Sequence, residues 1–352
     1  MSCAVVTRVY EIDPLQDLRW PEFLEGHRMA TLFHSTEWLN ALQRTYGYRA
    51  SVLTTSGPGE RLTNGLAFCR VQSWLTGRRL VSVPFSDHCM PLIDSQEEFG
   101  DLLSPLRQET DQGREKYLEI RSIAGGAGMP AGLSGSATFC LHRLDLRPSL
   151  NELFHAFHDS CIRRKIARAQ RVGLTYEDEM SEELLHKFYQ LAVLTRRRQQ
   201  IPPQPLSWFR NLIACIGDRV KIRLASQEGQ PAACILTIRY KSTMIYKYGC
   251  SDPRFHSLGS MQLVMWKAIQ EAKETGLLEF DMGRTDWNNE GLLTFKDRWG
   301  GTRSTLLYLR HPVPKPHHRT EDMSMRIAKR VFAWAPDSFF RAAGNILYRH
   351  IA

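Results

Sequence analysis

The sequence lacks the patterns that mark several classes of protein. Its eight cysteines are scattered, with no CxxC pair and no cysteine and histidine cluster at zinc spacing. No stretch approaches the ~18 apolar residues of a membrane-spanning helix, and Arg8 and Glu11 interrupt the region where a signal peptide needs its apolar run. Neither a Walker loop nor a dinucleotide-binding fingerprint occurs. We therefore expect a cytoplasmic protein with reduced cysteines and no bound metal.

The composition is that of an ordinary folded protein. The 352 residues are 43% hydrophobic and 24% charged, which argues against a disordered or fibrous chain, and the length favours two domains. The formal net charge of +9 favours polyanionic partners such as RNA, nucleotide phosphates or an anionic membrane face. Charge of this size does not choose among them, because it also occurs in proteins that bind none of them.

Hydrophobic periodicity predicts the same order of elements in both halves of the chain. The first half reads as strands at 4–12, 62–71, 79–84, 117–122 and 138–146 with helices at 35–46 and 97–109. The second half reads as helices at 159–172, 182–199, 208–215 and 257–275 with strands at 220–225, 232–240, 244–250, 278–282 and 305–310. A meander, a long helix and further strands, occurring twice, predict an α/β (α+β) protein of tandem GNAT-like domains, with mixed, mostly antiparallel sheets flanked by helices.

The predicted domain boundary lies near Arg147-Pro148-Ser149. We expect an N-terminal GNAT-like domain at 1–146, a C-terminal GNAT-like domain at 147–312, and a proline-rich linker with a basic, amphipathic helical tail at 313–352. The tail alternates apolar and basic residues, which is typical of a helix that lies at a membrane surface. Docking of the tail onto the second domain is the alternative.

The densest cluster of polar and aromatic residues runs from Asp281 to Gly301. It begins at the carboxyl end of a predicted strand, where α/β folds open their binding crevices. Asp281, Arg284 and Asn288 are therefore candidates for substrate binding. In the alternative interpretation the charged residues form a solvated rim, and the aromatic ones, Trp287, Phe295 and Trp299, are core anchors.

Several strings resemble one known family. FDMGRTDWNNEGLLTFKDRWGG resembles the C-terminal signature of FemAB-like proteins, in which a strand ending in Asp-x-Gly leads through a polar loop to a Phe-Lys pair and a Trp-Gly. FHSTEWLNALQRTYGYRA, CIRRKIARAQRVGLTYE and GSMQLVMWKAIQEAKETG resemble other segments of that family, in the family's order. The matches cover most of residues 31 to 310, so the chain resembles the FemAB-like branch of the GNAT superfamily of acyltransferases.

The resemblance implies an enzyme with two GNAT-like domains. Its best-known members transfer amino acids from aminoacyl-tRNA to peptidoglycan precursors, and other relatives are acetyltransferases or belong to exopolysaccharide and envelope systems. The implied function is acyl or aminoacyl transfer to an amino group of a small-molecule or lipid-linked envelope or exopolysaccharide precursor, at the inner face of the membrane. Acyl-CoA or aminoacyl-tRNA would be the donor, with no permanently bound cofactor. The chain lacks the coiled-coil arm of some tRNA-using members, so both donors stay open.

The family's Phe-Lys pair implies that Phe295 and Lys296 lie at the reacting centre. A lysine there can stabilise the carbonyl oxyanion or hold a donor phosphate. Alternatively, Lys296 is a surface residue on a short helix. The basic helix of the family implies that Arg163 and Arg164 hold a substrate anion, although a charge run on a helix is also typical of a solvated face.

The remaining candidates follow from position within the same pattern. They are Trp38 in the Ser-x-x-Trp helix entry, Asp87 or His88 as acceptor of the amine proton, Tyr248 on a strand facing the crevice, and Gly259 with Ser260 as donor-binding residues. The stretch from Arg254 to Ser260 keeps one glycine of the loop with which GNAT enzymes hold CoA pyrophosphate, but not the full motif. The rival interpretation is therefore a non-catalytic, basic RNA-binding or lipid-phosphate-binding module with a decayed GNAT fold.

Overall fold

The computed structural model describes residues 7–125, 132–313 and 336–350. The chain divides into two compact units. The first contains the described residues through Thr138, those from Thr305 onward to 313, and those from Ile346 onward. The second contains Phe139–Ser304 and the described residues that end at Asn345. The two units therefore do not follow the predicted boundaries at 146 and 312.

The first unit is a sheet with helices on it. Its strand order is β1-β2-β3-β4-β5-β12, antiparallel except for the parallel pair β4 and β5. Its strands are β1 (Tyr10–Ile12), β2 (Ala50–Thr54), β3 (Leu66–Ser73), β4 (Gly77–Val81), β5 (Leu118–Ile123) and β12 (Thr302–His311), and its helices are α1 (Arg19–Gly26), η1 (Leu32–His34), α2 (Thr36–Tyr46), α3 (Gln96–Asp111) and η5 (Tyr348–His350).

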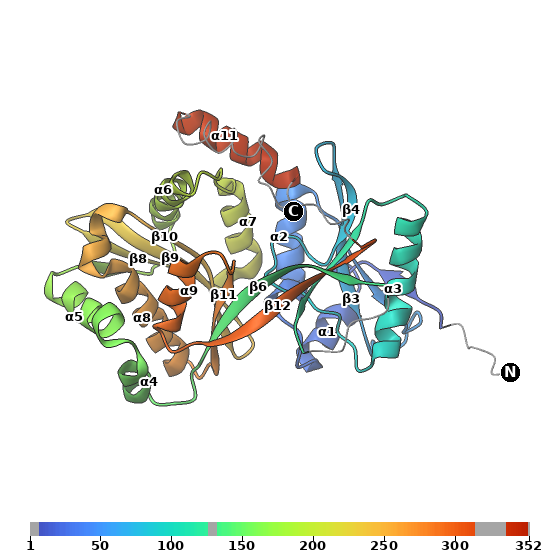
Figure 1. The fold of residues 1–352 in the computed structure, drawn as a ribbon, viewed down its shortest axis with the longest axis horizontal. Helices are drawn as coiled ribbons and strands as arrows, with labels where there is room; N and C mark the ends of the chain where they lie inside the picture. Colours follow the sequence, from blue (N-terminus) through green and yellow to red (C-terminus); the bar gives the residue numbers. More distant parts are fainter. Residues whose placement is uncertain (1–6, 126–131, 314–335, 351–352) are drawn as a thin grey trace. The chain divides into compact units, whose positions relative to one another are not determined.

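The second unit repeats this arrangement in the order β6-β11-β10-β9-β8-β7, with β10 and β11 as its parallel pair. Its strands are β6 (Ser134–Asp145), β7 (Thr175–Glu177), β8 (Val220–Gln227), β9 (Gln230–Tyr240), β10 (Thr243–Ser251) and β11 (Glu279–Thr285). Its helices are α4 (Leu150–Ala156), η2 (Asp159–Arg163), α5 (Arg164–Arg171), α6 (Glu182–Arg198), α7 (Leu206–Ile216), η3 (Gly217–Arg219), η4 (Pro253–Leu258), α8 (Ser260–Glu274), α9 (Glu290–Asp297) and α11 (Asp337–Leu347). Figure 1 labels most of these elements.

Each unit takes one strand from the other half of the sequence. β6 follows β5 in the chain but pairs with β11, while β12 follows β11 but pairs with β5. This exchange is the physical reason for the discontinuous units. The predicted fold class, α/β (α+β) with mixed, mostly antiparallel sheets flanked by helices, is confirmed.

Local signals determine where several helices begin. Ser35 caps α2 by accepting a hydrogen bond from the backbone N–H of Trp38 at 3.2 Å. The predicted helix at 257–275 is divided, because Gly259 has a φ of +83° and separates the short η4 from α8. The predicted basic helix at 159–172 opens with a π-helical turn, η2, before α5.

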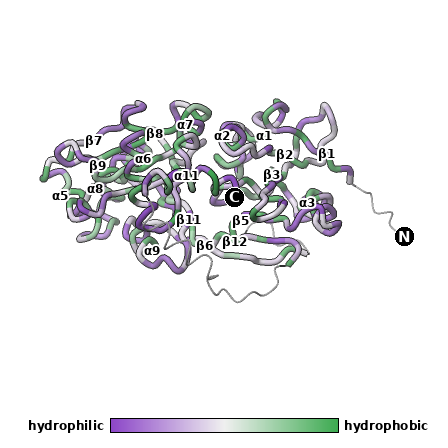
Figure 2. The backbone as a smooth tube through the Cα atoms, turned by 90° about the horizontal axis from the view of Figure 1, so that it is seen from above, coloured by the Kyte–Doolittle hydropathy of each residue, from purple (hydrophilic) through white to green (hydrophobic). Residues whose placement is uncertain are grey.

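The core of the second unit lies between its sheet and the helices α4, α5 and α8. Leu263, Val264 and Ile269 of α8 pack with Phe280 of β11 and Trp299. Helix α6 contacts β9 and β10 as well. Hydrophobic and hydrophilic residues alternate over short distances along the chain (Figure 2), as expected for amphipathic elements that bury one face.

The tail helix α11 packs on the second unit. Its Phe340 is fully buried under the guanidinium of Arg197, which also forms an ion pair with Asp337. Residues 337–345 therefore agree with the interpretation of the tail as a helix docked on the second unit. Residues 314–335 of the predicted tail lie outside the described residues. In the described part of the chain, no helix is both long and apolar enough to cross a membrane.

Candidate functional site

Strands β10 and β11 separate partway along their length. They pair only from Thr243 to Ile245 on β10 and from Glu279 to Asp281 on β11, although both strands continue. The register of β10 against β9 shifts between Tyr246 and Tyr248, at the point of separation. Main-chain groups on the facing strand edges can therefore pair with a third, extended molecule.

A cavity of about 270 Å³ lies beside this separation, in the second unit. It is bounded by the start of α8, by β10, by α9 and by the start of α5. Its lining consists of Lys165, Tyr246, Ser251, His256, Ser260, Met261, Gln262, Leu292 and Phe295. The structure thus brings two predicted site residues, Ser260 and Phe295, into one cavity.

The N-terminus of α8 has the features of an anion-binding site. Gly259 precedes the helix and has no side chain that could accept from its first N–H groups, so these groups have no side-chain cap at this position. Ser260 is 1% exposed, and its Oγ has no hydrogen-bond partner in the described part of the protein. A Cβ on Gly259 would lie 2.3 Å from the carbonyl oxygen of Lys165, so only glycine allows this approach. Free amides, a hydroxyl and the helix dipole together favour a bound phosphate.

Positive charge surrounds this helix end. Lys165 lines the cavity, and its charge and that of Arg198 act on His256. Burial, followed by these two cations, lowers the pKa of His256, which favours the neutral imidazole. Its Nε2 lies 2.9 Å from the Oγ of Ser251. From the sequence, Lys165 was predicted only as a member of the basic helix, and His256 was not predicted to be a site residue.

The Phe-Lys pair lies on α9, which Asn289 caps by accepting from the N–H of Leu292. Phe295 lines the cavity and packs against the core. Lys296 is 2% exposed, and its Nζ donates to the carbonyl oxygens of Gly283 at 2.7 Å and Arg284 at 3.3 Å. The alternative of a solvated surface lysine is therefore wrong. The ammonium lies on the part of β11 that has separated from β10.

A hydrogen-bonded chain that includes the buried His142 adjoins Lys296, and no residue pattern predicted it. The Nδ1 of His142 lies 3.5 Å from the Sγ of Cys140, and its Nε2 lies 3.0 Å from Oδ1 of Asp297. Hydrogen bonding from Arg303 lowers the pKa of Asp297, and burial lowers that of His142. A neutral His142 therefore donates to an ionised Asp297 and holds α9 against β6. Among the described residues, no group of three or more His, Cys, Asp or Glu side chains could hold a metal ion.

Comparison with known proteins agrees with this geometry. Residues 158–297, which contain the cavity and its helix end, match the family model of the acetyltransferase (GNAT) domain. No curated protein sequence matches the chain.

Similar solved structures extend over both units. The crystal structure of FemX is 14% identical, with a TM-score of 0.66, and the match covers 85% of this chain and 96% of FemX. The C-terminal domain of a putative lysylphosphatidylglycerol synthetase from Agrobacterium fabrum is 16% identical, with a TM-score of 0.55 and coverages of 84% and 91%. A tandem GNAT protein of the clavulanic acid biosynthesis pathway is 12% identical, with a TM-score of 0.56 and coverages of 88% and 99%. The FemAB-like, tandem GNAT fold is thus confirmed.

Other predicted residues of the second unit lie outside the cavity lining. Arg163 and Arg164 both pair with Asp159, at 3.1 and 2.8 Å. Their role as anion anchors stays a prediction, whereas the next residue, Lys165, lines the cavity. The remaining candidates are Asp281, which is buried and accepts from the N–H of Gly283, Arg284, which is exposed over the ring of Phe139, and Asn288, which is exposed.

The predicted residues of the first unit form a group of their own. Phe33 contacts the ring of Trp38 at a centroid distance of 5.1 Å and the ring of His88 at 5.6 Å, both edge-on. Trp38 is fully buried and is part of the core. The carbonyl of Asp87 accepts from the hydroxyl of Tyr308 at 2.9 Å. The structure thus brings Trp38 and His88 together, and their part in substrate binding stays a prediction.

Proposed function

We propose that the protein is an acyltransferase that moves an acyl group from acyl-CoA to an amino group. The observation that carries the proposal is the uncapped N-terminus of α8, with the unpartnered Ser260 hydroxyl, next to the separation of β10 and β11. The helix end would hold the pyrophosphate of CoA. The extended arm of CoA carries amide groups, and these would pair with main-chain groups of β10 beyond the residues that it pairs with β11.

The reaction would proceed by attack of the amine nitrogen on the thioester carbonyl. The new C–N bond forms, the C–S bond breaks, CoA leaves as a thiolate and the amine gives up a proton. Negative charge on the carbonyl oxygen would be stabilised by the ammonium of Lys296, and one preorganised donor of this kind lowers the barrier by about 3 kcal/mol. Asp87 and His88, which the sequence predicts as acceptors of the amine proton, belong to the first unit, and this role stays a prediction.

The acceptor that we propose is an amine of a cell-envelope precursor. The support is the resemblance to FemAB-like proteins and the structural likeness to the C-terminal domain of a putative lysylphosphatidylglycerol synthetase. Aminoacyl-tRNA is the second donor to be tested, because its phosphates share the chemistry that the helix end would bind.

Calorimetric titration with acetyl-CoA and with aminoacyl-tRNA tests the donor site. We expect acetyl-CoA to bind the wild-type protein and to bind Gly259→Ala at least about tenfold more weakly, because the new Cβ would meet the Lys165 carbonyl at 2.3 Å. Gly276→Ala is the matched control: Gly276 follows the other end of α8, has a φ of +77°, and has no neighbour within 4 Å of an added Cβ.

Two results would contradict the proposal. One is equal binding of acetyl-CoA to Gly259→Ala and wild type, and the other is no binding or transfer with either donor. Binding of RNA of any sequence, abolished by salt and without acyl transfer, would instead support the non-catalytic module.

A further inference from the structure

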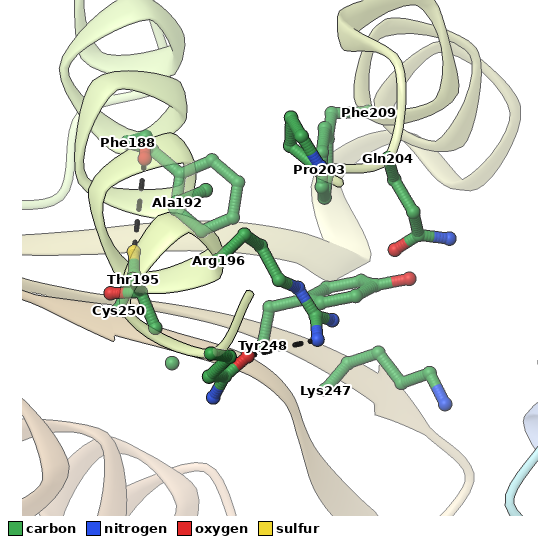
Figure 3. A pocket seen from close by; sticks show the side chains of 12 residues that line it. Phe188, Ala192, Thr195, Arg196, Pro203, Gln204, Phe209, Lys247, Tyr248 and Cys250 are labelled. Carbon is green, nitrogen blue, oxygen red and sulfur yellow. Dashed lines mark hydrogen bonds between the residues drawn. The ribbon is translucent and has the colours of Figure 1, made fainter. Parts of the chain in front are cut away.

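The turn between β3 and β4, residues 74–76, carries exposed apolar side chains. In this hairpin tip, Trp74 is 79% exposed and Leu75 is 51% exposed. The other described tryptophans are buried except Trp287, which is 37% exposed. Figure 3 shows the more common placement of an aromatic ring in this protein: Phe209 lines a pocket between α6, α7 and β10 and is 3% exposed. The exposure of Trp74 is thus an exception, and neighbouring exposed apolar side chains indicate a contact surface.

The hairpin tip is held in place by its own turn and by η5. The indole Nε1 of Trp74 donates to Nε2 of His350 at 2.9 Å, and the hydroxyl of Thr76 donates to the carbonyl oxygen of His350 at 2.9 Å. The Oγ of Ser73 accepts from the main-chain N–H groups of Leu75 and Thr76 at 3.1 and 3.0 Å. Because the single polar atom of the Trp74 side chain is bonded within the protein, the exposed part of the ring is apolar. An ordered surface of this kind loses little conformational entropy when it binds.

Basic side chains lie beside the hairpin tip. Residues 61–86 contain four arginines and neither Asp nor Glu. Arg78 follows the tip, and its carbonyl oxygen accepts from the main-chain N–H of Lys116 at 2.8 Å. Arg78, Lys116 and Arg349 are exposed. Glu115 pairs with Arg78 at 3.1 Å but is 3% exposed, whereas Lys116 and Arg349 form no ion pair with a described residue. The exposed charged side chains beside the tip are therefore positive.

The size and chemistry of this surface favour a lipid bilayer over a protein partner. A stable protein interface buries about 800 Å² on each partner, which two exposed apolar side chains do not supply. Tryptophan is enriched where the hydrocarbon of a membrane meets its headgroups, and basic residues close to that surface are attracted by anionic lipids. In the view of Figure 1 the turn between β3 and β4 lies beyond the ends of α2 and α3 of the same unit, so a flat surface can reach it.

We propose that the hairpin tip inserts Trp74 and Leu75 into the headgroup region of an anionic lipid bilayer. Arg78, Lys116 and Arg349 then lie at the level of the lipid phosphates. The tip supplies apolar contact and the three cations supply attraction to negative charge, so both are needed for strong binding. The inference goes beyond the proposed acyl transfer and does not depend on its donor or acceptor.

Binding to vesicles tests the proposal with the full chain and no substrate. The vesicles consist of phosphatidylcholine alone or of an equimolar mixture of phosphatidylcholine and phosphatidylglycerol, and binding is measured by co-sedimentation. We expect the wild type to bind the anionic vesicles, and to bind them more weakly as the salt concentration rises. Lys116→Gln should bind the anionic vesicles about fivefold more weakly, because one cation near the surface is removed.

Serine substitutions test the apolar part of the surface. We expect Trp74→Ser and Leu75→Ser each to bind the anionic vesicles at least about fivefold more weakly, because a large apolar side chain no longer leaves water. Leu75→Ser keeps the hydrogen bond between Trp74 and His350, so its effect does not come from a displaced η5. Leu18→Ser is the matched control: Leu18 is 83% exposed in the same unit, next to α1, and this variant should bind as the wild type does.

Trp74→Phe identifies the residue that enters the membrane. Lipids with brominated acyl chains quench the fluorescence of a tryptophan that lies close to them. We expect them to quench part of the emission of the wild type when it is bound to anionic vesicles. Trp74→Phe keeps an apolar ring and should still bind these vesicles, but its emission should not be quenched.

Two results would overturn the proposal. Binding of both serine variants equal to that of the wild type would place any membrane contact elsewhere in the chain. No binding of the wild type to either kind of vesicle would exclude a lipid partner. If sedimentation velocity then shows a wild-type dimer that Trp74→Ser dissociates, the hairpin tip is instead a contact between copies of the chain. Acyl transfer is not measured in any of these experiments, so the proposed function is tested separately.

Discussion

Replacing Lys296 by methionine separates its structural contribution from its proposed role in the reaction. Methionine keeps an unbranched side chain in the core but leaves the carbonyls of Gly283 and Arg284 without the ammonium that the structure shows. A buried polar group that loses its partner costs about 1–3 kcal/mol. Because two carbonyls lose the ammonium, we expect the free energy of unfolding of Lys296→Met to be lower by about 2–5 kcal/mol.

This loss is measurable as a change in melting temperature. For a unit of this size each kcal/mol shifts Tm by about 2–4 °C, so Tm should fall by about 5–15 °C in thermal denaturation followed by circular dichroism. Lys273→Met is the matched control. Its Nζ also donates to a main-chain carbonyl, that of Arg147 at 2.9 Å, but this hydrogen bond is exposed to solvent, so we expect a change of less than about 1 kcal/mol.

Activity is then measured at a temperature where both variants are fully folded. If the Lys296 ammonium stabilises the oxyanion, Lys296→Met should lose about a hundredfold to a thousandfold in kcat beyond any effect of unfolding. An unchanged Tm would contradict the burial of the ammonium against two carbonyls. Full activity in the folded variant would refute the role of Lys296 in the reaction and leave its structural role.

Two further predictions concern stability. Burial lowers the pKa of His34 to about 4, although the hydrogen bond between its Nε2 and the carbonyl oxygen of Met90, at 2.8 Å, acts in the opposite direction. The folded protein therefore binds this proton more weakly than the unfolded chain does. The contribution of His34 to the free energy of unfolding should be complete above pH 6.5, and the free energy should fall by up to about 3 kcal/mol between pH 6.5 and 4. Urea denaturation at several pH values measures how the free energy of unfolding depends on pH. This dependence should be weaker in His34→Gln than in wild type, whereas an equal dependence would exclude His34 as the cause. In α11, a Cβ on Gly344 would lie 2.0 Å from the carbonyl oxygen of Pro203, so Gly344→Val should undock the helix and make it sensitive to limited proteolysis; resistance equal to that of wild type would contradict the packing.

Some elements could be predicted because their signals are local. Helix α2 has a serine cap and apolar residues at helical spacing, and the meander β8, β9 and β10 has alternating or continuous apolar residues between turns. The helix α1 was missed because Pro21 reads as a helix breaker, yet it occupies the first turn, where a missing N–H costs nothing. The three-residue strand β7 is too short to show a period.

The sequence by itself determined the fold class and the order of most of the helices and strands. These follow from periodicity, turn residues and the quoted strings, all of which lie within short stretches of chain. Only the tertiary structure decided that β6 and β12 are exchanged between the halves, since strand pairing depends on contacts between distant residues. It also decided that Lys296 is buried on two carbonyls, and that His142 meets Asp297 across 155 positions of sequence. In each case a buried polar group must find a hydrogen-bond partner once water is removed. That partner lies far away in the sequence, so residue spacing cannot predict it.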